Sequence, residues 1–576
     1  MSTLEGDNIY SVSSLPAHAF NEWEDASVQS MEMSYGEPEY RERAETLVKE
    51  VKILLKEMHT GDGDLIERLE MVDALQCLGI YRYFQAEIKQ ALDYVYSCWD
   101  GNVGIGLGSE SPTQHLNATA LGIRVLRLHR YDVSADTLKN FKDKNGQFVL
   151  CGGNNDNNDE EEKVMRSMLN LFRLSSVAIP GEMVLEEAKA FSSRYLKELL
   201  ENSGDTVKRS FIKEVEYALT YEWPITFDRW EALNFIEIYD LNNERLMDKR
   251  ILELAKLNFN ILQFQYKLEM KNLSSWWAKS GISKLLAVRE RSIEYLFWAI
   301  TSVEELELSS SRIALVKCTT VITIVDDIFD DYATFEQLQC ITDAISKDWD
   351  VSLLENIPSN LKTSLEFVSK TIHELAMDAT KYQGRDMMPF VTKAWLDYTN
   401  ACFEQARWKV TGYFPSYNEY IKAAELSVAF GPILLHTALA ASPILCDEDI
   451  EKIYLDKSRF YHIMRVSMRL TDDIHDFEDE RLHGKMASAI SCYKGDHPNC
   501  SEEEAINNIV TLNNELLKEM IREFFKPNSH YLEWEKICVN STRGIGFFYI
   551  FGDGFTYSHK EIKEQIFKII VNPIKV

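Results

Sequence analysis

The sequence has few of the residues that interrupt helices. Its 576 residues include only 13 Pro and 25 Gly, fewer than the roughly 12% of an average chain. This composition excludes a collagen-like chain and disfavours a fold of many short strands joined by tight turns. With 45% apolar and 27% charged residues, the chain has the composition of a globular protein built from long helices.

Positive charge is also scarce. The chain has 62 Lys and Arg against 91 Asp and Glu, a net charge of −29. Nucleic acid is not expected as a partner, because phosphate backbones are bound by clustered basic residues. The first forty residues contain no Lys or Arg, whereas transit peptides are rich in Arg and poor in acids. We therefore expect a cytoplasmic protein.

The ten cysteines form no CxxC pair and are not densely spaced, so we expect reduced thiols rather than a disulfide framework. The longest uncharged stretch is Ser427 to Cys446, and Pro432, Pro443 and His436 interrupt it. We interpret it as a buried helix pair in a soluble protein, and we expect no membrane partner.

Helical periodicity of apolar residues dominates the chain, for example in residues 43–58 and from Leu252 onward. The polar segment 152–163, GGNNDNNDEEEK, is predicted to be a surface loop. A change in pattern near residues 224–229 places a domain boundary near residue 235. The predicted parts are an N-terminal segment 1–30, an N-terminal helical domain 31–235 and a C-terminal helical domain 236–576.

The first acidic cluster follows an apolar run. The segment VITIVDDIFDDY leads into Asp326, Asp327 and Asp330. Residues four apart on a helix lie about 40° around and about 6 Å along its axis, so Asp326 and Asp330 are predicted to share a face. Two such carboxylates can bridge Mg²⁺, which prefers oxygen ligands. The alternative is an acidic helix end in solvent, although the apolar run favours a helix that crosses the core to a cavity mouth.

The second acidic cluster lies in RLTDDIHDFEDE, residues 469–480. Asp472, Asp476 and Glu480 are four apart, which predicts one helical stripe of carboxylates about 12 Å long. Like charges at this spacing destabilise a helix by about 0.2–0.5 kcal/mol per pair, unless a counter-charge or cation faces them. A solvated acidic face is the alternative.

Three arginines accompany the two clusters. Arg289 and Arg291 lie in VRER, and Arg469 lies one helical turn before Asp472. Carboxylates that bridge metal to phosphate, with guanidinium groups that receive the departing anion, suit a site for a diphosphate ester. Local ion pairs with the neighbouring glutamates are the alternative for the VRER arginines.

At this point the sequence resembles a known family, the class I terpene synthases of plants. The resemblance covers essentially the whole chain and rests on FNEWED near Trp23, RWEA from Arg229, SSWW from Ser274, RERSIEYLFWA from Arg289, VDDIFDDYAT from Val325, RLTDDIHDFEDE from Arg469 and GDGFTYS from Gly552. The segments FKDKNGQF and MASAISCY are most similar to those of conifer sesquiterpene synthases of the selinene, humulene or longifolene type.

The resemblance implies an all-α, two-domain βα architecture: a catalytically silent N-terminal helical barrel followed by a class I helical bundle around an apolar cavity. It implies a monomer with three Mg²⁺ ions, with Mn²⁺ as a substitute, and a prenyl diphosphate substrate. The implied metal ligands are Asp326, Asp330, Asp472, Asp476 and Glu480. The implied diphosphate-binding residues are Arg289, Arg291, Asp327 and Arg469. The implied cation-stabilising pocket contains Trp298, Phe548, Phe555 and Asp553.

The sequence departs from the family pattern at three of these positions. Asp476 stands where Ser or Thr is commoner, which adds charge at a ligand of the third ion. Phe548 and Phe555 stand where many relatives carry Tyr, so no phenol is present at those positions to transfer a proton. Tyr549 and Tyr557 are neighbours that could take such a role.

The implied activity is Mg²⁺-dependent ionisation of a prenyl diphosphate followed by carbocation cyclisation. No DxDD motif occurs, which disfavours class II chemistry, and the tandem arginines of many plastidial monoterpene synthases are missing. A cytosolic enzyme acting on farnesyl diphosphate is therefore expected. The alternatives are a diterpene synthase acting on geranylgeranyl diphosphate, a chain-elongating prenyltransferase that uses DDIHD as a second aspartate motif, and a helical scaffold without chemistry.

Overall fold

The computed structural model describes most of the chain from Trp23 to Val576. The undescribed residues are 1–22, 60–64, 102–103, 106–111, 149–157, 203–206, 242–247, 287, 355–356, 441–443, 455–457, 483–486, 527–532, 553 and 556–559. The side chains of 58–59, 112–115, 158–160, 452–454, 478–482 and 533–534 are also outside the description.

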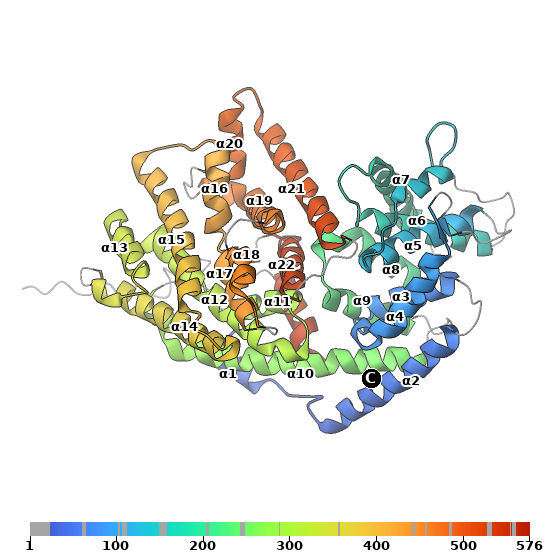
Figure 1. The fold of residues 1–576 in the computed structure, drawn as a ribbon, viewed down its shortest axis with the longest axis horizontal. Coiled ribbons are helices and arrows are strands. Elements are labelled where there is room, and N and C mark those ends of the chain that lie inside the picture. The colour runs from blue at the N-terminus through green and yellow to red at the C-terminus, as the bar shows by residue number, and fades with distance from the viewer. Residues whose placement is uncertain are drawn as a thin grey trace, which may run out of the picture. The chain divides into compact units, whose positions relative to one another are not determined.

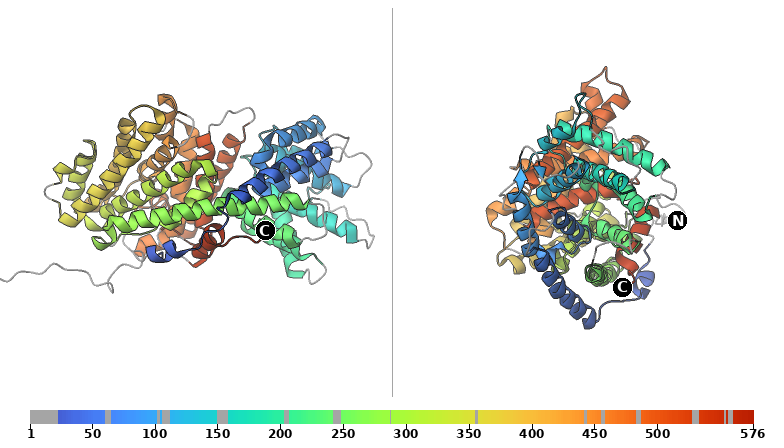
Figure 2. Two further views of the ribbon diagram at one scale, coloured as in Figure 1. Left: turned by 90° about the horizontal axis from the view of Figure 1, so that it is seen from below. Right: turned by 90° about the vertical axis from the view of Figure 1, so that its right-hand side faces the viewer.

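The chain folds into two compact helical units. Unit 1 contains residues up to Glu32, Tyr266–Thr511 and Phe548–Val571; unit 2 contains Met33–Gln265, Leu512–Phe547 and Asn572–Val576. Long helices account for nearly all regular structure in both units (Figures 1 and 2). The all-α, two-domain prediction is therefore confirmed, while the boundary near residue 235 stays a prediction.

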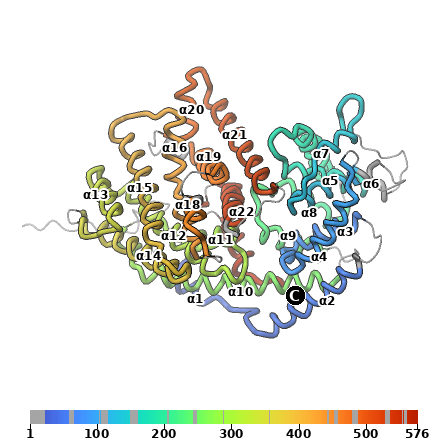
Figure 3. The backbone as a smooth tube through the Cα atoms, viewed as in Figure 1, coloured from blue at the N-terminus to red at the C-terminus, as the bar shows by residue number. Residues whose placement is uncertain are grey.

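In unit 2 several helices pack on the next helix along the chain, as α5 does on α6 and α6 on α7 (Figure 3). Its elements are α2 (Pro38–His59), α3 (Leu65–Cys77), η3 (Tyr81–Phe84), α4 (Gln85–Ser97), β1 (Trp99–Asp100), β2 (Gly104–Ile105), α5 (Pro112–Leu128), η4 (Ala135–Phe141), α6 (Asn158–Ser175), α7 (Met183–Asn202), α8 (Arg209–Thr220), η5 (Trp223–Ile225), α9 (Asp228–Leu241), and parts of α10 (Lys249–Ser280), α21 (Glu502–Phe524) and α22 (Glu533–Phe548). The strands β1 and β2 form a short antiparallel pair.

A buried ion network lies inside unit 2. Asp73 on α3 contacts Arg124 on α5 at 2.7 Å and Arg173 on α6 at 3.0 Å. Burial alone would raise the pKa of Asp73, but the two guanidinium groups lower it to about 2. The network therefore fixes three helices of this unit through charges that are paired rather than solvated.

The predicted loop 152–163 is wrong in its second half. Residues 152–157 lie outside the described part of the chain, but α6 begins at Asn158 and includes 159–163. Glu161 and Glu162 lie near the start of α6, where the positive end of the helix dipole stabilises negative charge. The acidic run therefore starts a helix instead of extending the loop.

Unit 1 is a bundle that contains both acidic clusters. Its elements are α1 (Asp25–Ser30), the rest of α10, η6 (Ile282–Lys284), α11 (Ser292–Ser302), η7 (Leu306–Leu308), α12 (Ser309–Asp327), the π-helical turn η8 (Ile328–Tyr332), α13 (Phe335–Ile345), η9 (Val351–Leu353), α14 (Ser359–Gln383), α15 (Met388–Thr411), α16 (Tyr417–Ser427), α17 (Phe430–Leu439), α18 (Asp447–Tyr454), α19 (Arg459–Leu482), α20 (Ala489–Asp496), the first part of α21, α23 (Lys560–Ile566) and the π-helical turn η10 (Phe567–Val571).

Helix α12 is the central helix of unit 1 and packs against α11, α14 and α17. A buried ion pair fixes its start: Arg312 on α12 donates to both carboxylate oxygens of Glu269 on α10, at 2.8 and 2.7 Å, and both side chains are almost fully buried. Arg312 also donates to the carbonyls of Val303 and Glu305. The position of α12 is therefore set by hydrogen bonds as well as by apolar packing.

The stretch Leu306–Tyr332, which contains α12, is the one described helical stretch long and apolar enough to cross a membrane. In the most apolar 18 residues of this stretch, 72% of the segment is buried inside the protein. Burial of this kind is typical of a core helix. The uncharged stretch Ser427–Cys446 contains α17, which is buried from Phe430 to Leu439 except at Gly431. The nine described cysteines form no disulfide.

Burial of His436 on α17 predicts a pH dependence of stability. Burial lowers the pKa of His436 to about 4 from its usual 6.5, and its Nε2 accepts a hydrogen bond from the indole of Trp395 at 3.2 Å. Because the unfolded chain binds the proton first, stability falls as pH drops from 6.5 to 4. Between pH 6.5 and 5 this group should cost about 1.6 kcal/mol of unfolding free energy.

His436→Gln keeps an acceptor for Trp395 but does not titrate. Urea unfolding at pH 6.5 and pH 5 should show a pH-dependent loss smaller by that amount in the variant, with exposed His497→Gln as the control. Equal losses in wild type and His436→Gln would contradict the prediction.

Candidate active site

Helix α11 is buried on every side and carries an arginine at its start. The whole of Ser292–Ser302 is buried because the segment IEYLFWAI is mostly apolar around its circumference. Arg291, the residue before α11, is 2% exposed and donates through Nη1 to the carbonyl of Glu290 at 2.9 Å. Trp298, in the middle of α11, is 1% exposed. Both predicted residues therefore lie in the interior.

Arg289 joins the segment before α11 to the end of α12. Its Nε donates to Asp327 Oδ1 at 2.7 Å, and its Nη2 donates to Asp326 Oδ2 at 2.8 Å. The backbone N–H of Arg289 donates to the second oxygen of Asp327 at 2.8 Å. The guanidinium thus pairs with the first acidic cluster, where the sequence alternative was a local ion pair with Glu290 or Glu294.

The first acidic cluster spans a change of helix type. Asp326 and Asp327 end α12, whereas Asp330 lies on the π-helical turn η8. The α-helical geometry used to align Asp326 with Asp330 therefore does not hold across this point, because a π-turn has more residues per turn. The side chain of Asp326 is 40% exposed and Asp330 is exposed, while that of Asp327 is 5% exposed. The outer two carboxylates can reach a ligand, and Asp327 holds Arg289.

Burial and ion pairing act in opposite directions on the pKa values of Arg289 and Asp327. Burial would lower the pKa of Arg289, but the adjacent charges of Asp327 and Asp326 raise it well above its usual value. Burial raises the pKa of Asp327 to about 6, against the lowering effect of Arg289. Arg289 therefore stays a cation at any physiological pH.

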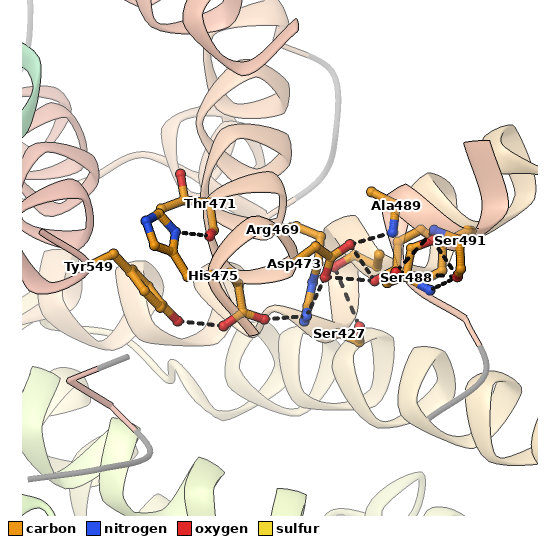
Figure 4. A network of polar contacts seen from close by, with 12 residues as sticks. Ser427, Arg469, Thr471, Asp473, His475, Ser488, Ala489, Ser491 and Tyr549 are labelled. Atoms are coloured by element: carbon orange, nitrogen blue, oxygen red, sulfur yellow. Dashed lines mark hydrogen bonds and ion pairs between the residues drawn. The ribbon is translucent and has the colours of Figure 1, made fainter. Parts of the chain in front are cut away.

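The second acidic cluster lies on α19 and contains its own guanidinium. Arg469 Nη1 donates to Asp472 Oδ2 at 2.6 Å, one turn along the helix as predicted. The phenol of Tyr549 donates to Asp472 Oδ1 at 2.6 Å, and its ring lies 4.9 Å from that of His475. Figure 4 shows this chain of contacts from Tyr549 to Arg469. The sequence analysis named Tyr549 as a neighbour of Phe548 that could take over a proton transfer; in the structure its phenol is bonded to Asp472.

Asp473, the next residue, is fully buried and has a different environment (Figure 4). Both of its oxygens accept from the phenol of Tyr420 on α16, at 2.9 and 2.8 Å. Its Oδ2 also accepts from the backbone N–H of Ala489, the first residue of α20, at 2.6 Å. Asp473 thus connects α16, α19 and α20 and leaves Asp472 as the carboxylate with more exposure.

Helix α15 lies within electrostatic range of both clusters. Burial raises the pKa of the Cys402 thiol well above its usual value, Asp326 and Asp330 raise it further, and Arg469 opposes them. Such influences require short separations. Charges of both clusters, which are far apart in sequence, therefore act on this one thiol. Cys402 lies in no motif and looks like an ordinary core residue, so the sequence analysis did not single it out.

Aromatic rings cluster around Phe555 in the same unit. Its ring centroid lies 5.6 Å from that of Trp298, 4.7 Å from that of Phe548 and 6.2 Å from that of Tyr295. Trp298, Phe548 and Phe555, which the family resemblance implied, are therefore brought together. Tyr295 is an addition that the sequence analysis did not single out.

Two implied residues lie outside the description: Asp553, and the side chain of Glu480 on α19. Asp476 is half-buried on α19. Among the described side chains, no three Asp, Glu, His or Cys are gathered closely enough to hold an ion. The donors nevertheless fit a hard divalent cation, because both clusters offer carboxylate oxygens and Asp326 and Asp330 reach the surface.

The fold and these contacts define an all-helical enzyme with two carboxylate–arginine groups in one unit. Residues 278–519 match the metal-binding domain of the terpene synthase family, and residues 22–219 match the terpene synthase N-terminal domain. The chain belongs to the terpene synthase family and is a class I terpene synthase.

Individual relatives agree over almost the whole chain. The chain is 43% identical to alpha-humulene synthase of Picea glauca and 42% identical to the chloroplastic delta-selinene-like synthase of Picea sitchensis, with 97% of both chains covered in each case. It is similar to the structure of isoprene synthase from grey poplar in complex with three Mg²⁺ ions and dimethylallyl-S-thiolodiphosphate. That match has 29% identity and a TM-score of 0.81, and covers 96% of this chain and 99% of the other.

The contacts of Asp473 predict a large effect on stability. Asp473→Ala leaves Tyr420 and the Ala489 N–H without their acceptor and removes a negative charge near Arg469. Removing a buried charged partner costs about 3–5 kcal/mol. Asp473→Asn, which keeps one acceptor oxygen, should lose less.

Urea unfolding measures both variants, with Asp378→Asn as the control because that side chain is 75% exposed in a surface ion pair. The control should change stability by less than about 0.5 kcal/mol. An Asp473→Ala protein as stable as the control would show that the network does not hold these helices together.

Proposed function

We propose that the chain ionises farnesyl diphosphate and cyclises the resulting carbocation to a sesquiterpene, releasing diphosphate. The carrying observation is that unit 1 holds two carboxylate–arginine groups, one from each motif: Arg289 with Asp326 and Asp327, and Arg469 with Asp472. The names of the humulene and selinene-like relatives support a hydrocarbon product. A diterpene synthase acting on geranylgeranyl diphosphate remains the alternative.

The metal ligands we propose are Asp326, Asp330, Asp472, Asp476 and Glu480. Mg²⁺, as three ions, would supply the positive charge that stabilises the departing diphosphate, and Mn²⁺ would serve in its place. The isoprene synthase complex, which holds three Mg²⁺ ions, supports this number.

Arg289, Arg291 and Arg469 are the proposed diphosphate-binding residues, with Asp327 holding Arg289. Arg289 and Arg469 already face carboxylates, so each guanidinium is fixed before the substrate arrives. Such preorganisation avoids the cost of ordering long side chains on binding. The C–O bond breaks with its electron pair leaving on diphosphate, and an allylic carbocation remains.

The aromatic cluster around Phe555 is the proposed wall for that cation. Electron-rich ring faces attract cations, by about 2 kcal/mol when water is excluded. Trp298 and Phe548 supply buried rings, and Asp553 completes the set implied by the family. Loss of a C–H proton from the cyclised cation would end the reaction as an alkene.

The chain-elongating prenyltransferase is disfavoured by the length of the chain and by its N-terminal domain, since residues 22–219 match the terpene synthase N-terminal domain. We also propose that the enzyme is a cytoplasmic monomer that acts without a membrane or nucleic acid. The location follows the expectation from the sequence, whereas several relatives are chloroplastic by name, among them the delta-selinene-like synthase.

Purified protein with Mg²⁺ and, separately, geranyl, farnesyl and geranylgeranyl diphosphate tests the proposal. Gas chromatography with mass spectrometry of the organic extract should find a fifteen-carbon hydrocarbon from farnesyl diphosphate. A twenty-carbon product alone would replace this substrate by the alternative. No hydrocarbon from any of the three would refute the proposed activity.

A further inference from the structure

One polar pair lies inside the aromatic cluster. Tyr295 on α11 and Thr323 on α12 are both buried, and their hydroxyl oxygens are 2.8 Å apart. Tyr295 lies one turn before Trp298, and Thr323 lies one turn before Asp327. The pair therefore joins the helix that carries the aromatic wall to the helix that carries the first acidic cluster.

The direction of the hydrogen bond follows from the second partner of Thr323. Thr323 Oγ1 donates its proton to the carbonyl of Thr319 at 3.0 Å. A threonine hydroxyl has one proton, so it accepts from Tyr295 rather than donating to it. The phenol proton thus points at Thr323, and the oxygen of Tyr295 keeps its lone pairs for other neighbours.

The surroundings of Tyr295 are those of the proposed cation wall. Its ring stacks on Phe555 with an interplanar angle of 27°, and Phe555 also contacts Trp298. The other phenol near Phe555, Tyr549, donates its proton to Asp472. Burial raises the pKa of Tyr295 to about 12, so the phenol is neutral at working pH.

We propose that Tyr295 is a specificity-determining residue, whose ring and oxygen dipole, oriented by Thr323, favour particular positions of positive charge in the bound hydrocarbon cation. Rings attract a cation through their faces, and the phenol oxygen adds the negative end of a fixed dipole. Small differences between competing cations decide which product forms. Tyr295 takes no part in C–O cleavage, which belongs to the carboxylates and arginines. This inference rests on the proposed function.

Four variants test the inference. Tyr295→Phe removes only the hydroxyl, and Thr323→Val removes its acceptor while keeping the shape. Thr323→Ser restores the hydroxyl. The matched control is Tyr217→Phe, which removes an equally buried phenol that pairs with a threonine hydroxyl, that of Thr226 at 3.2 Å, in unit 2.

Each variant is assayed with Mg²⁺ and farnesyl diphosphate for product ratios and total diphosphate release, and its melting temperature is recorded. Tyr295→Phe and Thr323→Val should each change the ratio of the main product to the next by at least about threefold, with total release within about threefold of wild type. Thr323→Ser and Tyr217→Phe should leave the product ratios unchanged.

Unchanged ratios in Tyr295→Phe, or in Thr323→Val if the first variant does not fold, would overturn the inference. So would a loss of diphosphate release at unchanged melting temperature, because Tyr295 would then act in ionisation. A wild-type protein that yields no fifteen-carbon hydrocarbon refutes the farnesyl assignment instead. If it converts geranylgeranyl diphosphate, the same comparison is made on the twenty-carbon products.

Discussion

The ion pairs of Arg289 with Asp326 and Asp327 are the constraint on which the rest of the site depends. Helix α12 ends at its negative pole with two carboxylates, one of them almost fully buried, and this arrangement is unfavourable without a counter-charge. Arg289 supplies that charge from the segment before α11, through three hydrogen bonds. The end of α12 and the start of α11 are therefore held together, which fixes Trp298 and Tyr295 relative to the acidic cluster.

The second cluster uses the same principle with different partners. Arg469 is held by Asp472, and Asp473 is neutralised by donors from α16 and α20. In each cluster one carboxylate is buried and hydrogen-bonded within the fold, Asp327 or Asp473, and its neighbour, Asp326 or Asp472, is more exposed. This division explains how an acidic motif can stay folded without a bound cation and still offer oxygen atoms to one. Because the buried carboxylate of each cluster is fixed, its more exposed neighbour has little conformational freedom.

The helical class, the two motifs and the pairing of Arg469 with Asp472 could be predicted from the sequence, because each depends on local spacing along one helix. The partner of Arg289 could not, since it lies 37 residues away and glutamates flank the arginine. The π-turn at Asp330 was missed because periodicity assumes an α-helix throughout. Tyr295, Tyr420 and Cys402 were missed for a related reason: buried polar residues outside motifs look like core residues until packing shows what they contact.

The most direct test of the account is diphosphate release from farnesyl diphosphate with Mg²⁺, measured in parallel for wild type and Asp326→Asn. The substitution keeps the size of a side chain that is 40% exposed and leaves the buried pair of Arg289 with Asp327 in place, so the melting temperature should stay close to that of wild type. The account predicts release that is slower by at least about a hundredfold in the variant, equivalent to about 2.7 kcal/mol of transition-state stabilisation. A folded Asp326→Asn enzyme with wild-type release would contradict the assignment of this acidic cluster to catalysis.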